Sequence, residues 1–285
     1  MATPRMIAER TLRGSGNVLL NSPLPAKTLP MRPPLPISGV VITKNEADRI
    51  VRCVASLRGL CAEVLVLDSG STDDTVARAR DAGARVEHQD WLGFAAQKNA
   101  AIAAAAQPWV LLLDADEWLA AGADESLRAL FASGRIDGAD VWRLQRRTHF
   151  LGKALNFGGW GRESVDRLFR PDLRYLPAQV HERLDLAGKR IGRVDARIEH
   201  DTARSAGEYR DKLDRYARLF AEQRRAAGKR AGVLAPWTHA GFYLLKNFIV
   251  RGGFLDGPMG WKYHALHARY VWNKYRQMRK PTPTP

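Results

Sequence analysis

Two carboxylates separated by one alanine, Asp114 and Asp116, follow an apolar run at 109–113 that predicts a buried strand. Carboxylates so close together repel each other, and burial increases that cost. A divalent cation would relieve both effects, and hard oxygen ligands favour Mg²⁺ or Mn²⁺, which in turn bind diphosphates. The alternative is a pair of solvated loop acids, because an isolated Asp-x-Asp pattern is common. The two carboxylates therefore indicate metal-assisted chemistry if other polar side chains lie close to them in the fold.

Polar residues also follow two other predicted strands, at 40–43 and 63–67. These residues are Thr43, Asn45, Glu46, Asp68 and Gly70. A carboxylate such as Asp68 can accept hydrogen bonds from a base or a ribose, or it can cap the next helix, although Ser71 or Asp73 could form that cap instead. A glycine lets the backbone approach a ligand closely. Lys98, on a predicted helix, can reach a phosphate or can simply be solvated.

The elements that must position these residues alternate between strand and helix. Strands are predicted at 40–43, 63–67, 85–87 and 109–113. Helices are predicted at 46–58, from Ser71 or Thr72 as the cap to Ala82, and at 94–106. This alternation predicts an α/β fold, with a mostly parallel sheet and flanking helices. Because ligands of such sheets bind beyond the carboxyl ends of the strands, we expect the polar clusters at one edge.

Charge is distributed unevenly along the 285 residues, which carry 45 Lys and Arg against 30 Asp and Glu. Residues 1–36 are proline-rich and net +4, 37–200 are neutral, and 201–285 are net +11. We therefore expect an irregular N-terminal extension, a catalytic domain at 37–200 and a basic, aromatic helical segment at 201–285. No apolar run reaches the roughly 18–20 residues of a membrane-spanning helix. Two cysteines exclude a disulfide framework and a Cys-based zinc site.

Several short motifs follow one another along the chain. In the first half they are VITKNE at 41–46, DSGSTD at 68–73, QKN at 97–99 and LDADE at 113–117. In the second half they are FLGK at 150–153, GGW at 158–160, RLFR at 167–170, VHE at 180–182 and GFLDG at 253–257. Together they resemble the family 2 glycosyltransferases of GT-A fold, and most closely the bacterial lipopolysaccharide-core β-1,4-glucosyltransferase type. The resemblance spans about 37–278.

This resemblance implies an inverting transferase that uses a nucleotide diphosphate sugar, most often UDP-linked, together with Mg²⁺ or Mn²⁺. It assigns Thr43, Asn45, Glu46, Asp68 and Gly70 to nucleotide-sugar binding, Lys98 to the base or diphosphate, Asp114 to the ribose, and Asp116 to the metal. Inversion by one displacement needs a base on the acceptor hydroxyl and charge stabilisation on the leaving diphosphate.

On the acceptor side the resemblance suggests Glu182 as the base and Asp166 as its rival. Glu182 can instead form a surface ion pair with Arg183. His181 is expected to contact the diphosphate or to hold Glu182. Each remaining candidate has a structural alternative. Trp160 is expected to stack on a sugar ring, or else to belong to the core, and Arg167 is expected to bind acceptor or diphosphate anions, or else to be a charge on an edge strand. His200 is expected to contact the metal or a phosphate, or else to be a structural histidine.

The basic C-terminal segment predicts helices at 205–227, at 237–250 and beyond Pro258. Aromatic residues mixed with Lys and Arg suit a lipid headgroup interface, whereas the alternative is a hairpin packed on the catalytic body. We expect peripheral attachment to anionic lipid at the cytoplasmic face of the bacterial inner membrane. There a lipid-linked saccharide would accept a hexose, with glucose as the expectation from the family.

Other classes of function compete with this interpretation. A nucleotidyltransferase normally has a Gly-rich phosphate loop after its first strand, and this sequence has none there. The surplus of positive charge suggests nucleic-acid binding, yet zinc-finger and RNA-binding signatures are absent, so no nucleic-acid partner is expected. The alternative to the enzyme is a basic protein that binds nucleotide sugars or nucleic acid without transferase activity.

Overall fold

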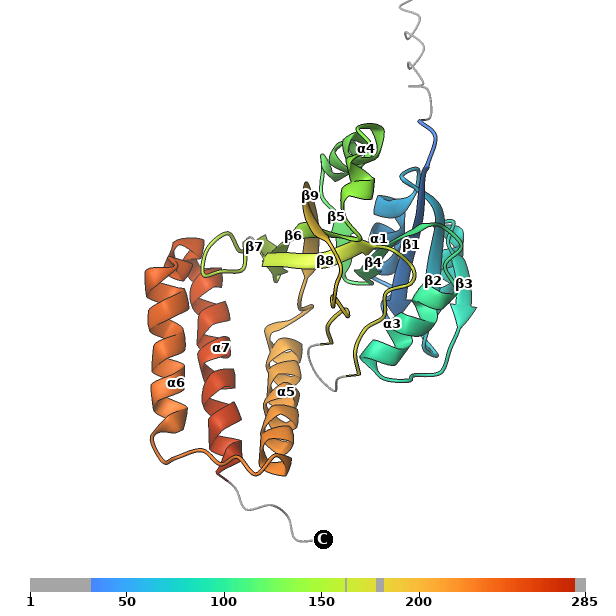
Figure 1. Cartoon of the computed structure of the whole chain (residues 1–285). Helices are drawn as coiled ribbons and strands as arrows, with labels where there is room; N and C mark the ends of the chain where they lie inside the picture. Colours follow the sequence, from blue (N-terminus) through green and yellow to red (C-terminus); the bar gives the residue numbers. More distant parts are fainter. Residues whose placement is uncertain (1–31, 162, 178–181, 280–285) are drawn as a thin grey trace, which may run out of the picture. The chain divides into compact units, whose positions relative to one another are not determined.

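The computed structural model describes residues 32–161, 163–177 and 182–279 (Figure 1). Within these residues a nine-stranded sheet has the order β3-β2-β1-β4-β8-β6-β9-β5, and β7 pairs with β6. The strands are β1 (Leu35–Thr43), β2 (Cys61–Asp68), β3 (Arg85–His88), β4 (Trp109–Asp114), β5 (Glu117–Leu119), β6 (Val141–Phe150), β7 (Lys153–Ala154), β8 (Glu163–Phe169) and β9 (Ile191–Asp201). The helices are α1 (Ile50–Leu57), α2 (Thr75–Asp81), α3 (Phe94–Ala103), α4 (Ala123–Ala132), the 3₁₀ turn η1 (Arg135–Gly138), α5 (Ala206–Ala226), α6 (Ala235–Tyr243), the π-helical η2 (Leu244–Val250), the 3₁₀ turn η3 (Gly253–Asp256) and α7 (Gly257–Met278).

The first half of the sheet is parallel, as the alternation of strands and helices predicted. β1 pairs with β2 and β4, and β2 pairs with β3, all in parallel. Side chains of β1 alternate between the two faces: Val41 packs with α1, α2 and α4, whereas Val40 and Ile42 pack with α3. Helices therefore cover both faces of this half, and the predicted α/β fold class is confirmed (Figure 1).

Two boundaries near the first strand differ from the prediction. β1 begins at Leu35, so the predicted extension of 1–36 overlaps the sheet by its last two residues. α1 begins at Ile50 instead of Glu46. The reason is local, because Asn45 has a left-handed φ of 55° and the carbonyl of Glu46 accepts the first turn bonds. The residues between Asn45 and Ile50 thus form a turn at the edge of the sheet.

Of the caps predicted for α2, Ser71 and Thr72 were wrong, whereas the Asp73 side chain does contact the start of the helix. The helix begins at Thr75, and its first backbone N–H donates to Asp73 Oδ1 at 3.0 Å. The Ser71 hydroxyl, one of the two predicted caps, donates to Asp68 instead. Thr72, the other, donates its backbone N–H to Asn45 Oδ1. Both residues therefore belong to the loop between β2 and α2.

The second half of the sheet, for which no strands were predicted, is mainly antiparallel. β8 runs antiparallel to β4 and β6, while β9 runs parallel to β6 and antiparallel to β5. Trp142 pairs with Leu168 and Arg143 pairs with Asp166, so Arg167 is the extra residue of a bulge in β8. A bulge re-aims the side chain of the extra residue, and this one lies beside the polar edge of β4.

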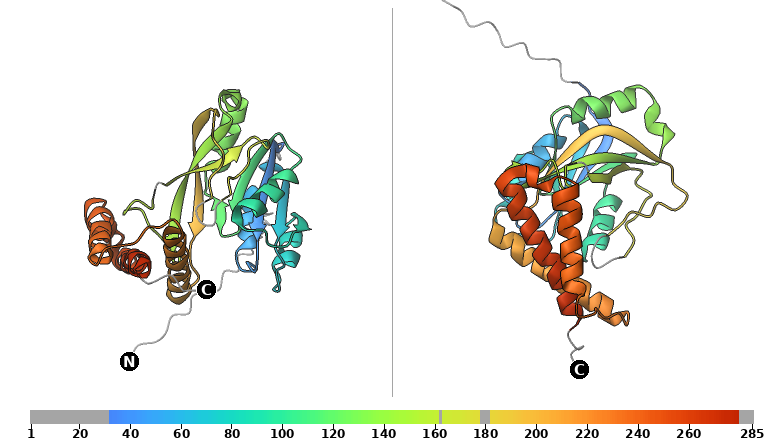
Figure 2. Two further views of the ribbon diagram at one scale, coloured as in Figure 1. Left: turned by 60° about the horizontal axis from the view of Figure 1, so that its bottom comes forward. Right: turned by 90° about the vertical axis from the view of Figure 1, so that its left-hand side faces the viewer.

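The C-terminal segment is helical, as predicted, and α6 continues directly into η2. Tyr209 of α5 and Tyr263 of α7 pack against Phe150 in a separate core cluster. Gly253 lies against the ring of His264, where a Cβ atom would clash. α6 and α7 lie side by side at the surface (Figure 2). Among the helices described, none combines the length and the apolar character that crossing a bilayer requires.

Candidate active site

The carboxyl ends of β1, β2 and β4 meet at one edge of the sheet. In the strand register Thr43 pairs with Asp68, and Ile42 pairs with Asp114. Parallel pairing forces this outcome, because strands that run in the same direction end at the same edge. The predicted meeting of the three polar clusters is confirmed.

The loop after β2 is organised by Asp68, which is buried. Its Oδ2 accepts hydrogen bonds from the backbone N–H groups of Gly70 and Ser71, both at 2.9 Å. Gly70 has a φ of 83°, a conformation that favours glycine. Asn45 connects this loop to β1, because its Oδ1 accepts the Thr72 N–H at 2.8 Å. Asp68 therefore shapes its own loop, and it does not cap α2.

Lys98 of α3 brings together two acids that are far apart in the sequence. Its Nζ donates to Glu182 Oε1 at 2.7 Å and lies 3.2 Å from Asp114 Oδ1. Burial alone would lower the pKa of Lys98, but these carboxylates, Asp114 foremost, hold it above its usual range. Glu182 thus pairs with Lys98 and not with Arg183, which was the structural alternative.

A second network fixes Asp114 from the opposite side. Arg167 donates to Asp114 Oδ2 at 2.9 Å and to Glu117 Oε1 at 2.7 Å, and Arg146 donates to Glu117 at 3.0 Å. Glu117 is fully buried and also accepts the backbone N–H of Asp114 at 3.1 Å. Burial would raise the pKa of Asp114, but Lys98 and Arg167 hold it well below its usual range.

Sequence reasoning missed Glu117 and Arg146 as parts of this site. The available signal for Glu117 was its place directly after the Asp-x-Asp pair. Arg167 was expected to bind acceptor or diphosphate anions. Instead it is buried, and its guanidinium forms ion pairs with Asp114 and Glu117. Its role in this arrangement is to hold Asp114.

Asp116 and His200 form the pair at which a metal ion was predicted. His200 Nε2 lies 3.4 Å from Asp116 Oδ2, and the pairing of β5 with β9 sets this separation. Burial would raise the pKa of Asp116, but His200 lowers it on balance. Within the described ranges, no group of three or more His, Cys, Asp or Glu side chains is arranged to hold a metal ion.

Glu46 lies at the same edge and is held by arginines. Arg204, which follows β9, donates to Glu46 Oε2 at 2.7 Å, and Arg49 lies 3.4 Å from the same atom. Burial, with a contribution from Asp116, raises the pKa of Glu46 to about 7 despite the two arginines. Arg204 was also missed, because its partner is in a distant part of the chain.

Two predicted site residues are not part of this cluster. Asp166 pairs with Arg143 at 2.7 Å. Trp160 packs against the core of the helical segment, with ring centroids 5.4 Å from Tyr263 and 5.0 Å from His267, which favours the alternative of a core position, and its stacking on a sugar stays a prediction. His181 lies outside the described residues.

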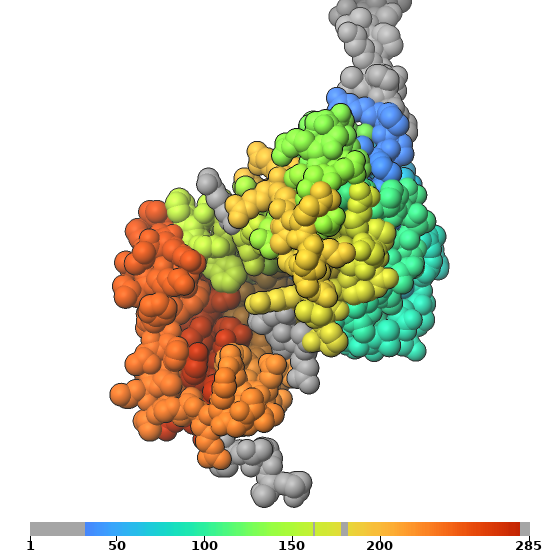
Figure 3. All heavy atoms as spheres, in the orientation of Figure 1, coloured from blue at the N-terminus to red at the C-terminus, as the bar shows by residue number. Residues whose placement is uncertain are grey.

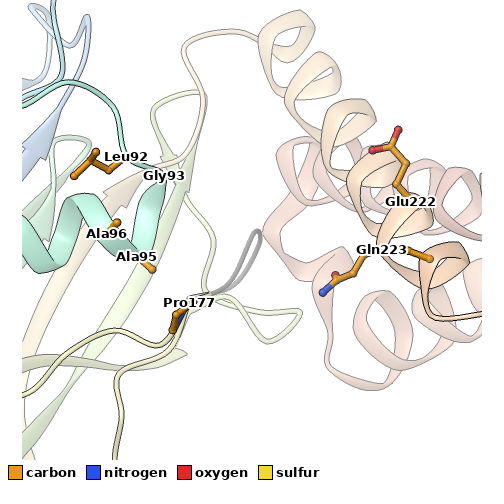
Figure 4. A pocket seen from close by; sticks show the side chains of 8 residues that line it. Leu92, Gly93, Ala95, Ala96, Pro177, Glu222 and Gln223 are labelled. Atoms are coloured by element: carbon orange, nitrogen blue, oxygen red, sulfur yellow. The ribbon is translucent and has the colours of Figure 1, made fainter. Parts of the chain in front are cut away.

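An open pocket of about 760 Å³ lies between the start of α3 and the end of α5. Leu92, Gly93 and Ala95 line one side, and Glu222 and Gln223 of α5 line the other (Figure 4). Ala95 is three positions before Lys98 on the same helix, so the pocket and the Lys98 pair share a helix face. The residues that line the pocket do not include Lys98, which is buried.

Comparisons with known proteins identify the family of the chain. Residues 38–177 match the family model described as "Glycosyl transferase family 2". The lipopolysaccharide core biosynthesis glycosyltransferase LpsC of Rhizobium meliloti (strain 1021) is 31% identical over 275 residues, 88% of this chain and 97% of that protein. An uncharacterized glycosyltransferase of Rickettsia felis is 45% identical over 101 residues, 35% of this chain and 36% of that protein.

Solved structures give a more partial likeness. Glucosyl-3-phosphoglycerate synthase from Mycobacterium tuberculosis, crystallised with Mn²⁺, UDP and glucosyl-3-phosphoglycerate, is 29% identical with a TM-score of 0.33. The match covers 39% of this chain and 44% of that one. The family rests on the sequence relatives, above all on the match that extends over most of both chains. The chain belongs to glycosyltransferase family 2 and is a glycosyltransferase with a relative in lipopolysaccharide core biosynthesis.

Proposed function

We propose that the chain transfers a hexose, with glucose as the first candidate, from a UDP-linked sugar to a saccharide acceptor of lipopolysaccharide core or a related envelope glycan. The transfer inverts the anomeric centre. The observation that carries the proposal is Lys98, whose Nζ lies 2.7 Å from Glu182 and 3.2 Å from Asp114. The ammonium group of Lys98 thereby links Asp114, on the side of the sugar donor, to Glu182, the candidate base. The name of the Rhizobium relative supports the acceptor class.

The nucleotide sugar would bind along the loops after β1 and β2. The buried hydroxyl of Thr43 has no hydrogen-bond partner among the described residues, which leaves it available to a nucleotide. Asn45 and Asp68 shape the loops, and Gly70 lets the backbone approach the ligand. Glu46 borders the same edge. Lys98 would pair with the diphosphate.

The donor atoms at Asp116 fit a divalent cation. Magnesium is usually bound by one or two carboxylates together with substrate phosphates and waters. A carboxylate and an imidazole 3.4 Å apart therefore provide enough protein ligands once a diphosphate is present. Asp116 and His200 would hold Mg²⁺ or Mn²⁺, whereas Asp114 is already engaged by Lys98 and Arg167. When bound, the ion neutralises charge on the diphosphate.

The reaction is a single displacement at the anomeric carbon. The acceptor oxygen forms its bond to that carbon as the bond to the diphosphate oxygen breaks, and Glu182 takes the proton of the acceptor hydroxyl. Lys98 lies beside the departing diphosphate and balances its charge. Asp166 is the weaker candidate for the base, because it pairs with Arg143 outside the cluster that Lys98 forms with Asp114. The acceptor is expected to be lipid-linked, at the cytoplasmic face of the inner membrane.

The test measures release of nucleoside diphosphate from a panel of nucleotide sugars, with Mn²⁺, with Mg²⁺ and with EDTA. We expect metal-dependent release from one donor and its loss in Asp116→Asn. No binding or turnover of any donor with either metal would refute the proposal. Binding without turnover by the wild-type chain would instead identify a nucleotide-sugar-binding protein.

The base is tested by a matched pair of neutral variants. Glu182→Gln should slow turnover by roughly 10²–10⁴-fold while donor binding stays within a few fold. Asp166→Asn, which removes an equal charge from β8, should retain most of the turnover. The reverse result would transfer the role of base to Asp166.

A further inference from the structure

The segment formed by α6 and η2 is apolar on nearly every side. Residues 235–250 contain one charged side chain, Lys246. A helix at the surface of a protein in water normally has a polar face. One side of α6 packs on α7, where Trp237 meets Trp272 with ring centroids 5.5 Å apart. Even so, Trp237 remains 67% exposed and Val250 75% exposed.

The exposed apolar side chains continue from η2 to the start of α7. Trp261 is 61% exposed, and its ring contacts Phe248 of η2 at 4.5 Å between centroids. We call six of these side chains the apolar hairpin surface: Trp237, Phe242, Leu245, Ile249, Val250 and Trp261. They lie on the helices at the left of Figure 3. Exposed apolar surface of this extent marks an interaction site.

The charges around this surface select the kind of partner. Residues 235–279 contain seven Lys and Arg and a single acid, Asp256. Asp256 is engaged by the backbone N–H groups of Asn156 and Phe157. A second copy of the chain would therefore bring like charges together, which is unfavourable. An anionic surface with an apolar interior complements both features.

A groove between α6 and α7 supports the same partner. It has a volume of about 450 Å³ and is lined by the apolar side chains of Trp237, Leu244 and Trp272, with Arg269 among its lining residues. An apolar channel of this kind fits an acyl chain, and the Arg269 guanidinium beside it pairs with Asp214 of α5 at 2.9 Å.

We propose that α6, η2 and the turn into α7 lie in the interface of an anionic phospholipid bilayer. The apolar hairpin surface is buried among the acyl chains, and Lys246, Arg251 and Lys262 lie at the headgroups. Tryptophan and cationic side chains prefer this depth of a membrane. The proposal gives the transferase proposed above a membrane partner, but vesicle binding itself does not require the transfer reaction.

The full chain is mixed with vesicles of phosphatidylcholine alone, or of phosphatidylcholine and phosphatidylglycerol in equal parts, and the vesicles are sedimented. We expect sedimentation with the anionic vesicles, a decrease with added salt, and little sedimentation with phosphatidylcholine. Insertion is read from quenching of tryptophan fluorescence by brominated lipid. Combining Trp237→Gln, Ile249→Gln and Trp261→Gln should weaken binding by at least about tenfold.

Two further variants separate insertion from misfolding. Val51→Gln on α1 replaces a side chain that is 43% exposed on the catalytic body and should leave vesicle binding unchanged. Lys246→Gln and Lys262→Gln change only exposed charges and should each weaken binding to anionic vesicles about fivefold, because each cation near the surface contributes about 1 kcal/mol.

The proposal is overturned if the wild-type chain does not sediment with anionic vesicles, or if the apolar and lysine variants bind as tightly as wild type. It is also overturned if the chain self-associates and the apolar variant abolishes that association without affecting vesicle binding, since the surface would then bind a second copy. Vesicle binding without turnover of any nucleotide sugar would contradict the proposed transferase alone.

Discussion

Glu117 offers a direct test of the buried network behind Asp114. Its carboxylate is fully buried and accepts from Arg167 at 2.7 Å, from Arg146 at 3.0 Å and from the backbone N–H of Asp114 at 3.1 Å. Glu117→Gln keeps the shape and removes the charge, which leaves the buried Arg167 and the partly buried Arg146 undercompensated. Breaking a buried ion pair from one side costs about 3–5 kcal/mol. We therefore expect a loss of that size in the free energy of unfolding.

Glu163→Gln is the matched control. Glu163 pairs with the same Arg146, at 2.6 Å, but its side chain is 39% exposed. Exposed ion pairs contribute about 0–1 kcal/mol, so this variant should unfold close to wild type. The charge removed and Arg146 are the same in both variants, so the difference reports the burial of Glu117 together with its two further partners, Arg167 and the Asp114 N–H.

The assay is thermal and urea unfolding of wild type and both variants. For a domain of this size about 3–5 kcal/mol lowers Tm by roughly 10 °C. Adding Arg146→Met to Glu117→Gln should cost less than the sum of the single changes, because both changes remove the same Arg146–Glu117 contact. Equal Tm values for Glu117→Gln and Glu163→Gln would refute the reasoning, since burial would then have no effect.

The remaining predictions concern titration and the loop beside the helical segment. Burial lowers the pKa of His267 to about 3. As pH decreases from about 6.5, the imidazole is therefore protonated in the unfolded chain before the folded one, and the stability of the fold should decrease. His267→Phe should flatten the acidic limb of a plot of Tm against pH, and parallel curves for the variant and wild type would contradict this. Burial raises the pKa of Glu46 to about 7. Between about pH 4.5 and that value the folded chain keeps a proton on Glu46 that the unfolded chain has lost, so the stability of the fold should decrease as pH rises. Glu46→Gln should remove this decrease, and an unchanged dependence of Tm on pH would contradict the prediction. Asp256 accepts hydrogen bonds from the backbone N–H groups of Asn156 at 2.9 Å and Phe157 at 3.1 Å. Asp256→Ala should therefore lower the free energy of unfolding by about 1.5–3 kcal/mol per lost bond and speed proteolysis of the 155–161 loop. Cleavage of this loop at the wild-type rate would show that Asp256 does not hold it in place.

Much of the fold followed from local patterns in the sequence. β-branched runs, helical periodicity and intervening turns predicted the four parallel strands and the helices between them. Parallel pairing then required Thr43, Asp68 and Asp114 to meet at one edge, since the carboxyl ends of such strands coincide. The family could also be inferred from the order of its motifs, because each motif is a short run of consecutive residues that can be read directly from the sequence. The assigned roles of Asp116, Glu182 and His200 stay predictions until the experiments above are done.

Tertiary structure decided which side chains pair. The contact of Lys98 with Glu182 joins residues 84 positions apart, and no periodicity encodes such a partner. Trp160 could belong to a sugar site or to the core, and only the tertiary structure shows that it packs against Tyr263. The bulge in β8 leaves Arg167 unpaired in the ladder, beside Asp114, while Asp166 stays opposite Arg143. Sequence alone determined the local elements and the edge where they end, whereas the charges around Asp114 depend on strand register, which is set by contacts along the whole sheet.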